Sequence, residues 1–286
     1  MKNTLRIAIQ KKGRLSDQSL LLLRECGIHV NNGISQLKAR SATFPLEVLY
    51  LRDDDIPQYV SEGIADLGIL GENVVWEKDK SVQIQEKLGF GRCRLALAIR
   101  REEDFGELNW FQNKTIATSY PGLLSKFLKQ NNIAASIEEI SGSVEIAPGI
   151  GLSDAVCDVV SSGSTLITNG LKEVHTVMVS EAVLIKNGSL NNTKTSLLNQ
   201  LTFRIEAVKN ARQNKYILLN VPNESVDRIC QILPGMRSPT ILPLAQSGWS
   251  SLHSVVREGD FWEMIDQLKQ LGAEGILVCP IEKMAL

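Results

Sequence analysis

The chain has 286 residues, which corresponds to about two domains at roughly 150 residues each. Hydrophobic residues make up 43% and charged residues 22%, a composition typical of globular proteins and not of disordered or disulfide-stapled chains. The 31 Lys and Arg residues nearly balance the 32 Asp and Glu residues, and the formal net charge is -1. This balance excludes a chain-wide basic field for binding long nucleic acid but leaves room for a local anion site.

Cysteine spacing and the N-terminus indicate the compartment. The five cysteines are far apart and form no Cys-x-x-Cys pair, which favours buried, reduced thiols over a disulfide framework or a zinc site. The first apolar stretch is too short for the core of a signal peptide, and no run of about 18 apolar residues could span a membrane. We therefore expect a cytoplasmic protein that does not associate with membranes.

Short apolar runs alternate with helical periodicity through most of the chain. The expected strands are 5–9, 46–51, 66–70, 94–99, 115–118 and 157–160. The expected helices are 17–26, 121–130, which has proline in its first turn, and 166–171. This alternation favours an α/β protein with mainly parallel sheets covered by helices. Such sheets bind ligands at the carboxyl ends of their strands.

The last part of the chain has a different order of elements. The pattern predicts strands at 216–221, 240–244, 252–256 and 275–281, with helices at 224–233 and 261–271. In the second helix Phe261, Ile265 and Leu268 share one buried face. The order β-α-β-β-α-β is that of the ferredoxin-like unit. A polar stretch at 186–195, followed by a helix with apolar residues at 197, 201, 205 and 208, is expected to form the connection.

The segment from Asp154 to Leu166 is the most informative for chemistry. An expected strand there ends in Ser161, Ser162, Gly163, Ser164 and Thr165, and a helix follows. Backbone N–H groups at a helix start converge on an anion, glycine allows close approach, and hydroxyls add donors, so the segment fits a phosphate monoester. Asp154 and Asp158 could accept hydrogen bonds from the hydroxyls of an attached sugar. The alternative is a turn that only caps the helix, and spacing alone does not decide between the two.

Two other segments are weaker candidates for anion binding. Lys11, Lys12, Gly13 and Arg14 follow the first expected strand, and Arg14 could make a two-pronged contact with phosphate. The alternative is a solvated basic loop before a helix cap at Ser16. The segment from Ala65 to Glu72 has two glycines around a buried strand, which allows close backbone approach but is also explained by packing.

Several common chemistries are excluded by the motifs. The chain has no Gly-x-x-x-x-Gly-Lys-Ser/Thr loop, and Gly89-Phe90-Gly91 continues as Arg92-Cys93-Arg94, which is not a dinucleotide fingerprint. His29, His175 and His253 are isolated in sequence, which favours structural roles over a metal cluster or a histidine-based triad.

Several motifs in order along nearly the whole chain carry a family resemblance. They are Lys12-Gly13-Arg14-Leu15, 65–71, Thr118-Ser119-Tyr120-Pro121, Ser141-Gly142-Ser143-Val144-Glu145-Ile146-Ala147-Pro148, 151–155, 161–166 and Leu233-Pro234-Gly235-Met236-Arg237-Ser238-Pro239-Thr240. As an ordered set they resemble the long form of the ATP phosphoribosyltransferase family, which catalyses the first step of histidine biosynthesis.

The resemblance implies a fold and an assembly. Residues 1–210 would form a catalytic part of two α/β lobes similar to periplasmic binding proteins, with a second lobe at roughly 93–180 inserted in the first. Residues 211–286 would form a ferredoxin-like, ACT-like regulatory domain that binds histidine as a feedback inhibitor. The protein would be a homo-oligomer, a hexamer built from dimers.

The resemblance also implies a reaction and its site. ATP and phosphoribosyl pyrophosphate would react, with Mg²⁺, to phosphoribosyl-ATP and pyrophosphate. The residues implied for phosphoribosyl pyrophosphate are Glu145, Asp154, Asp158, Ser161, Ser162, Gly163, Ser164 and Thr165. Those implied for ATP and pyrophosphate are Gly13, Arg14, Asp66, Gly71, Glu72 and Tyr120. The transition state would have oxocarbenium character, which nearby carboxylates stabilise, and no covalent nucleophile is needed.

Two other functions share parts of this pattern. A two-lobed small-molecule binding protein would have the same lobes, but such proteins are normally exported and we find no signal sequence. A purely regulatory subunit would have the C-terminal unit, but the intact segment from Asp154 to Thr165 argues against it.

Overall fold

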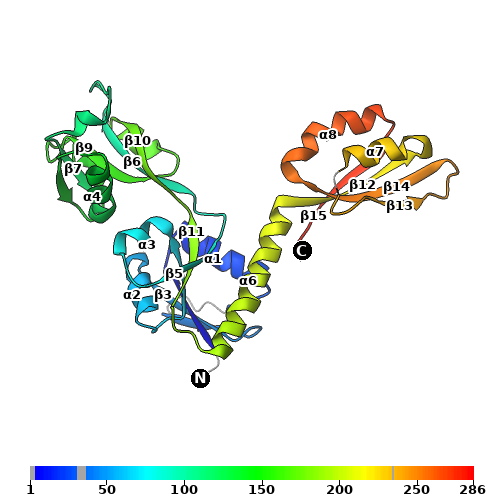
Figure 1. Cartoon of the computed structure of the whole chain (residues 1–286), viewed down its shortest axis with the longest axis horizontal. Helices are drawn as coiled ribbons and strands as arrows, with labels where there is room; N and C mark the ends of the chain where they lie inside the picture. Colours follow the sequence, from blue (N-terminus) through cyan, green and yellow to red (C-terminus); the bar gives the residue numbers. More distant parts are fainter. Residues whose placement is uncertain (1–3, 31–36, 234) are drawn as a thin grey trace. The chain divides into compact units, whose positions relative to one another are not determined.

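The structure, a computed structural model, describes residues 4–30, 37–233 and 235–286 and divides the chain into two compact units, Met1–Leu198 and Asn199–Leu286. Pro234, in the last of the family motifs, lies outside the described residues. The first unit contains two sheets, and the second unit contains one (Figure 1).

The first sheet has six strands in the order β2-β3-β1-β4-β11-β5. Their bounds are β1 Leu5–Gln10, β2 Lys38–Arg40, β3 Leu46–Leu51, β4 Leu67–Gly71, β5 Gln83–Lys87 and β11 Ala182–Lys186. Its helices are α1 Arg14–Glu25, α2 Ile56–Ser61 and α3 Glu72–Lys78, with a 3₁₀ turn η1 at Asp53–Asp55. β1 pairs in parallel with β3 and β4, whereas β11 runs antiparallel to β4 and β5.

The second sheet has five strands in the order β10-β6-β9-β7-β8. The strands are β6 Cys93–Arg100, β7 Thr115–Thr118, β8 Ser136–Glu139, β9 Ala155–Val160 and β10 Leu171–Ser180. Its helices are α4 Pro121–Gln130 and α5 Ser164–Thr168, with 3₁₀ turns η2 at Leu108–Phe111 and η3 at Val144–Ile146. β7 is parallel to β8 and β9, and β6 is antiparallel to β9 and β10.

Two short segments join the lobes that these sheets form. One connects β5 to β6 and the other connects β10 to β11, and they are hydrogen-bonded to each other. The N–H of Leu88 donates to the carbonyl of Ala182 at 2.9 Å, and the N–H of Ala182 donates to the carbonyl of Phe90 at 2.9 Å. Gly89 and Gly91 have φ of 76° and 62°, a backbone conformation that glycine adopts without strain. The second lobe is therefore inserted between β5 and β11 by a two-stranded crossover.

Most of the expected elements are present, but the expected sheet type is wrong. Strands 46–51 and 115–118 and helix 121–130 have the predicted bounds. Both sheets are mixed rather than mainly parallel, because five pairings along them are antiparallel and only four are parallel. The bounds predicted for the helix at 166–171 are also wrong. The helix α5 runs from Ser164 to Thr168, and Leu171 begins β10. α1 begins at Arg14, so Ser16 lies inside the helix, buried, and is not its cap.

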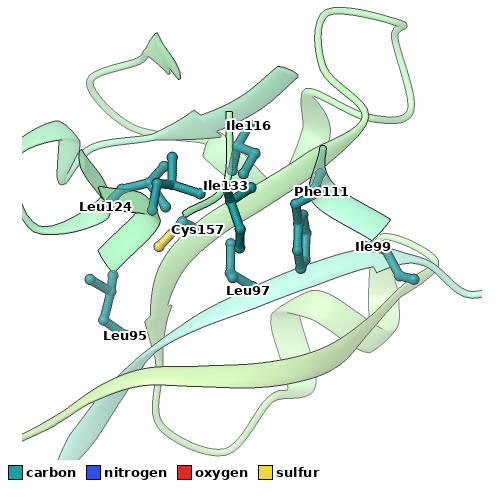
Figure 2. Close-up of a cluster of buried hydrophobic side chains, with 10 residues drawn as sticks. Leu95, Leu97, Ile99, Phe111, Ile116, Leu124, Ile133 and Cys157 are labelled. Carbon is teal, nitrogen blue, oxygen red and sulfur yellow. The ribbon is translucent and has the colours of Figure 1, made fainter. Parts of the chain in front are cut away.

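The core of the second lobe explains one of the cysteines. Figure 2 shows the Cys157 sulfur among Leu95, Leu97, Ile116 and Leu124, and none of these five residues is exposed. Burial strongly raises the pKa of the Cys157 thiol, which keeps it protonated at neutral pH. Cys157 is thus a packing residue of β9, the strand that leads into the serine-rich segment.

The second unit has the β-α-β-β-α-β order expected from the sequence. It begins within the long helix α6, Asn192–Gln213, and continues with β12 Asn214–Pro222, α7 Val226–Ile232, β13 Thr240–Pro243, β14 Trp249–Arg257, α8 Glu258–Gln270 and β15 Glu274–Pro280. The antiparallel sheet has the order β13-β14-β12-β15. Ile217, Leu219 and Leu252 form a core with Ile229 of α7 and Leu268 of α8. No helix in the described part of the chain is long and apolar enough to cross a membrane.

Candidate functional site

A pocket of about 130 Å³ lies at the carboxyl end of β9. It is lined by Glu145 of η3 and by the end of β9, the serine-rich loop and the start of α5. These lining residues are Asp158, Val159, Val160, Ser161, Ser162, Gly163, Thr165 and Leu166. The structure therefore brings together most of the residues that the sequence assigned to phosphoribosyl pyrophosphate.

The loop that borders this pocket is a hydroxyl-rich turn directly before α5. Gly163 has φ of 81°, a left-handed backbone conformation that glycine allows, and it immediately precedes α5. Ser161, Ser162, Ser164 and Thr165 are exposed. Ser162 and Ser164 hydroxyl oxygens lie 3.0 Å apart, so these hydroxyls converge on one side of the loop. Ser164 itself is next to the pocket residues but does not line the pocket.

Arg94, which the sequence analysis missed, holds this loop in place. Its guanidinium donates to the Ser161 carbonyl at 3.2 Å and pairs with both carboxylate oxygens of Glu173, the shorter bond being 2.5 Å. The hydrogen bond from Arg94 lowers the pKa of Glu173, so the pair is ionised at neutral pH. No local motif marks Arg94, because the pairing of β6 with β10 and β9 creates the contact.

Two carboxylates face the pocket. Asp158 is partly buried, and its Oδ1 accepts the N–H of Val159 at 2.7 Å. Burial raises the pKa of Asp158, the Val159 hydrogen bond opposes this, and the charge of Glu145 adds to the increase. The two carboxylates line the same pocket and repel each other. They would therefore favour binding of a cation or of a sugar that donates hydroxyl hydrogen bonds.

Asp154 does not join this group, which corrects the prediction. It precedes β9, at the amino end of a six-residue strand, whereas the pocket lies at the carboxyl end. At about 3.3 Å per residue the strand holds the two ends far apart. The Asp154 carboxylate instead accepts the N–H of Thr115 at 2.8 Å and lies 3.6 Å from the Lys114 ammonium. Asp154 therefore fixes the start of β9 against β7.

Asp66 has a structural role of the same kind, which also corrects its assignment. It is 4% exposed and precedes β4. Its two carboxylate oxygens lie 2.7 and 2.8 Å from the Lys194 ammonium, and one of them accepts the N–H of Arg6 at 2.9 Å. Both oxygens of this buried carboxylate thus have partners within the protein, which leaves little for a ligand.

The other residues predicted for ATP and pyrophosphate lie at carboxyl ends of strands. Gly71 ends β4, and Glu72 begins α3 next to the crossover, where its N–H donates to the Glu181 carbonyl at 2.9 Å. The Glu72 carboxylate is paired through Oε2 with the Lys87 ammonium at 2.9 Å. Gly13 and Arg14 follow β1, are exposed and begin α1.

Tyr120 is a partly buried residue whose phenol is affected by carboxylates of both lobes. It immediately precedes α4, and its N–H donates to the Thr118 hydroxyl at 2.9 Å. Burial strongly raises the pKa of Tyr120, and the charge of Asp158 adds to this, followed by those of Asp53 and Asp54. Asp158 belongs to the second lobe, whereas Asp53 and Asp54 follow β3 of the first. The Tyr120 phenol therefore stays protonated at neutral pH, as that of an ordinary tyrosine does, and can donate a hydrogen bond.

Two carboxylates line the pocket and could contact a divalent cation that a substrate brings with it. No group of three or more His, Cys, Asp or Glu side chains that could hold a metal exists among the described residues. Mg²⁺ at phosphate sites usually keeps waters and substrate oxygens and takes only one or two protein carboxylates. Glu145 and Asp158 provide that number.

Comparison with known proteins identifies the family of this chain. Residues 52–207 match the ATP phosphoribosyltransferase family, and residues 211–283 match the family "HisG, C-terminal domain". The ATP phosphoribosyltransferase of Cytophaga hutchinsonii is 56% identical over 284 residues, 99% of each chain. That of Azobacteroides pseudotrichonymphae is 58% identical over 282 residues, 99% of this chain and 100% of the relative.

Two solved structures share the fold of more than two thirds of this chain. A chain of the "ATP phosphoribosyl transferase (HisG:HisZ) complex from Thermotoga maritima" has a TM-score of 0.62 and 26% identity and covers 71% of this chain and 96% of that chain. The substrate-binding protein of an amino acid ABC transporter has a TM-score of 0.50 at 13% identity, over 73% of this chain and 94% of that chain, which shows a shared two-lobed fold alone. The chain belongs to the ATP phosphoribosyltransferase family, glycosyltransferase-type enzymes that begin histidine biosynthesis.

Proposed function

We propose that the chain transfers the phosphoribosyl group of phosphoribosyl pyrophosphate to N1 of ATP, releasing pyrophosphate. The observation that carries this proposal is the pocket at the end of β9, where two carboxylates and a hydroxyl-rich loop meet. Ser161, Ser162 and Thr165 would bind the 5-phosphate through hydroxyls, together with backbone N–H groups after Gly163. Asp158 and Glu145 would lie along the ribose.

The reaction needs few groups from the protein. Adenine N1 carries no proton that must be removed before it attacks the anomeric carbon. The bond to pyrophosphate breaks as the new bond forms, and the sugar gains positive charge, as in glycoside cleavage. Asp158 and Glu145 would stabilise that charge by electrostatic attraction. Mg²⁺ bound to pyrophosphate oxygens would balance the leaving group's charge.

ATP would bind on the side of the pocket where Tyr120 lies. The Tyr120 phenol is protonated at neutral pH, so its hydroxyl can donate to the nucleotide. Gly13 and Arg14, exposed at the end of β1, and Gly71, at the end of β4, supply further positions for phosphate contacts. We exclude Asp66 and Asp154 from this proposal because their carboxylates are occupied at the opposite ends of their strands.

Regulation and assembly form a second part of the proposal. Residues 1–210 would be the catalytic domain and 211–286 a regulatory domain that binds histidine in a homo-oligomer of dimers up to a hexamer. The match of residues 211–283 to the C-terminal domain of the family supports a dedicated unit there. The pathway it would serve is cytoplasmic, in agreement with the free thiols of the described cysteines.

Pyrophosphate release tests the reaction. Purified protein mixed with ATP, phosphoribosyl pyrophosphate and Mg²⁺ should release pyrophosphate, whereas omission of either substrate or addition of EDTA should stop it. A two-lobed binding protein or a purely regulatory subunit would bind a ligand and release none. Absence of turnover with both substrates and Mg²⁺ present would contradict the proposal.

A further inference from the structure

A carboxylate of the first lobe supplies the N-terminal cap of a helix in the second lobe. The first backbone N–H groups of an α-helix have no partner within the helix and are usually bound by a Ser, Thr, Asp or Asn immediately before it. α4 is preceded by Tyr120, whose side chain makes no such bond. Instead, the N–H of Gly122 donates to Glu77 Oε1 at 2.9 Å, and that of Leu123 to Glu77 Oε2 at 2.8 Å.

Glu77 reaches this helix from a distant part of the chain. It lies in α3, which follows β4 of the first sheet, whereas α4 follows β7 of the second. Each carboxylate oxygen binds one N–H, and the helix dipole favours a negative charge at this end. The contact is therefore charge-assisted and joins the two lobes independently of the crossover segments.

The residue at position 122 fits this contact. A Cβ atom on Gly122 would lie 3.1 Å from Glu77 Oε1, 3.2 Å from Oε2 and 3.3 Å from Cδ. These distances are tighter than ordinary side-chain contacts, so a larger residue would push the carboxylate away. Glycine here permits the close approach of Glu77, while its φ is unremarkable for a helix.

The capped turn is directly connected to the pocket. Tyr120 immediately precedes α4, and its carbonyl accepts the N–H of Leu124 at 3.0 Å. Its own N–H donates to Thr118, whose hydroxyl donates to the Cys157 carbonyl of β9 at 2.6 Å. The next residue of β9 is Asp158. A displacement of the first turn of α4 would therefore move Tyr120 relative to Asp158.

We propose that Glu77 is a positioning residue for phosphoribosyl transfer: its carboxylate fixes the start of α4 across the two lobes and thereby holds Tyr120 beside the Asp158 pocket. This inference rests on the proposed function, in which Tyr120 contacts ATP. The loop from Ser161 to Thr165 has its own support from Arg94, so Glu77 should affect ATP more than phosphoribosyl pyrophosphate.

The direct test is the variant Glu77→Gln. In this variant the side-chain NH₂ group faces the N–H of either Gly122 or Leu123. Both groups are donors, so one of the two hydrogen bonds to α4 is lost. We expect KM for ATP to rise about tenfold, equivalent to about 1.4 kcal/mol, with KM for phosphoribosyl pyrophosphate changed less than about twofold. Glu77→Asp, which keeps the charge, should restore part of the ATP affinity. Glu102→Gln, at an exposed carboxylate after β6, is the matched control and should resemble wild type.

Coupling to Tyr120 separates positioning from general stability. The losses of ATP-binding free energy caused by Tyr120→Phe and by Glu77→Gln should not add up in the double variant. The reason is that Glu77 acts on ATP binding through Tyr120. Equal increases in both KM values, an unchanged KM for ATP, or additive effects would each overturn the proposal.

Hydrogen exchange gives a readout that does not depend on turnover. The peptide with the first turn of α4 should exchange faster in Glu77→Gln than in wild type or Glu102→Gln, and ATP should bind more weakly by direct titration. If wild type releases no pyrophosphate, the proposed reaction fails while these two measurements still test the contact. Equal exchange in wild type and Glu77→Gln would show that Glu77 does not hold the helix.

Discussion

Asp158 is the carboxylate whose protonation should matter most for sugar binding. Burial raises its pKa above the ordinary Asp value of about 3.9, and the charge of Glu145 acts in the same direction. A raised pKa means that the group takes up a proton at a higher pH than a solvated aspartate does. Protonation removes the negative charge that the ribose hydroxyls and the developing cation would contact.

We therefore predict a pH-dependent difference between wild type and Asp158→Asn. At neutral pH the variant should have a higher KM for phosphoribosyl pyrophosphate. As the pH falls below neutral, wild-type Asp158 takes up a proton at a higher pH than a solvated aspartate would, so the ratio of the two KM values should shrink. Because both enzymes are measured with the same substrate at each pH, protonation of the substrate affects both KM values equally and does not change their ratio. A ratio that does not change with pH, or a change in KM for ATP alone, would contradict the assigned contact.

Thr165 tests the phosphate cradle itself. Its hydroxyl is exposed at the first turn of α5 and Thr165 lines the pocket. Thr165→Ala should weaken phosphoribosyl pyrophosphate binding by about 1–3 kcal/mol if the hydroxyl donates to phosphate. Thr168→Ala is a matched control in the same helix, since its hydroxyl donates to the Ser164 carbonyl at 3.0 Å. Equal affinities for wild type and Thr165→Ala, measured by titration, would place the phosphate elsewhere.

At the scale of elements, the crossover is stabilised by a buried hydrogen-bond pair between α3 and the end of β10. The N–H of Asn73 donates to the Ser180 hydroxyl at 3.0 Å, and that hydroxyl donates to Asn73 Oδ1 at 2.9 Å. Both residues are buried, Ser180 with 1% of its surface exposed. The pair joins the helix that carries Glu77 to the segment that leads from one lobe to the other.

Removing that hydroxyl should cost stability. Ser180→Ala leaves a buried N–H and a buried amide oxygen without this partner, so we expect the free energy of unfolding to fall by about 1–3 kcal/mol. Urea denaturation followed by fluorescence would measure it. Ser189→Ala, at an exposed position, should leave stability close to wild type. A fall equally large at Ser189 would show that the loss is not specific to the crossover.

Several elements with a strong local pattern were predicted from the sequence, but β10 and β11 were missed, although four of the five residues of β11, AVLIK, are apolar. Apolar runs such as 46–51 and the proline at the start of helix 121–130 mark their elements locally. β5, with the sequence QIQEK, and β8, with SIEE, have only one apolar residue each and were missed. Strand direction was also predicted wrongly, because antiparallel pairing of β11 with β4 joins segments more than a hundred residues apart.

At the scale of the whole molecule, we expect removal of the C-terminal unit to abolish histidine inhibition but not catalysis. Truncation after about Gln213 removes the unit that matches the C-terminal domain of the family. We expect histidine to inhibit the full chain without competing with phosphoribosyl pyrophosphate and to have no effect on the truncated chain. Initial rates of pyrophosphate release with and without histidine measure this. Histidine inhibition that persists in soluble, active truncated protein would contradict a regulatory role for the unit.

The sequence by itself determined the family, the order of most elements and the serine-rich loop, because these depend on residues that are adjacent along the chain. The positions of Asp66 and Asp154 were also predictable, because both residues precede apolar runs. Each therefore lies at the amino end of a strand, whereas ligand sites lie at carboxyl ends. The tertiary structure decided the mixed sheets, the Arg94 support of the loop and the capping of α4 by Glu77. Those features depend on strand pairing and contacts between lobes, which join residues far apart in sequence and leave no local pattern.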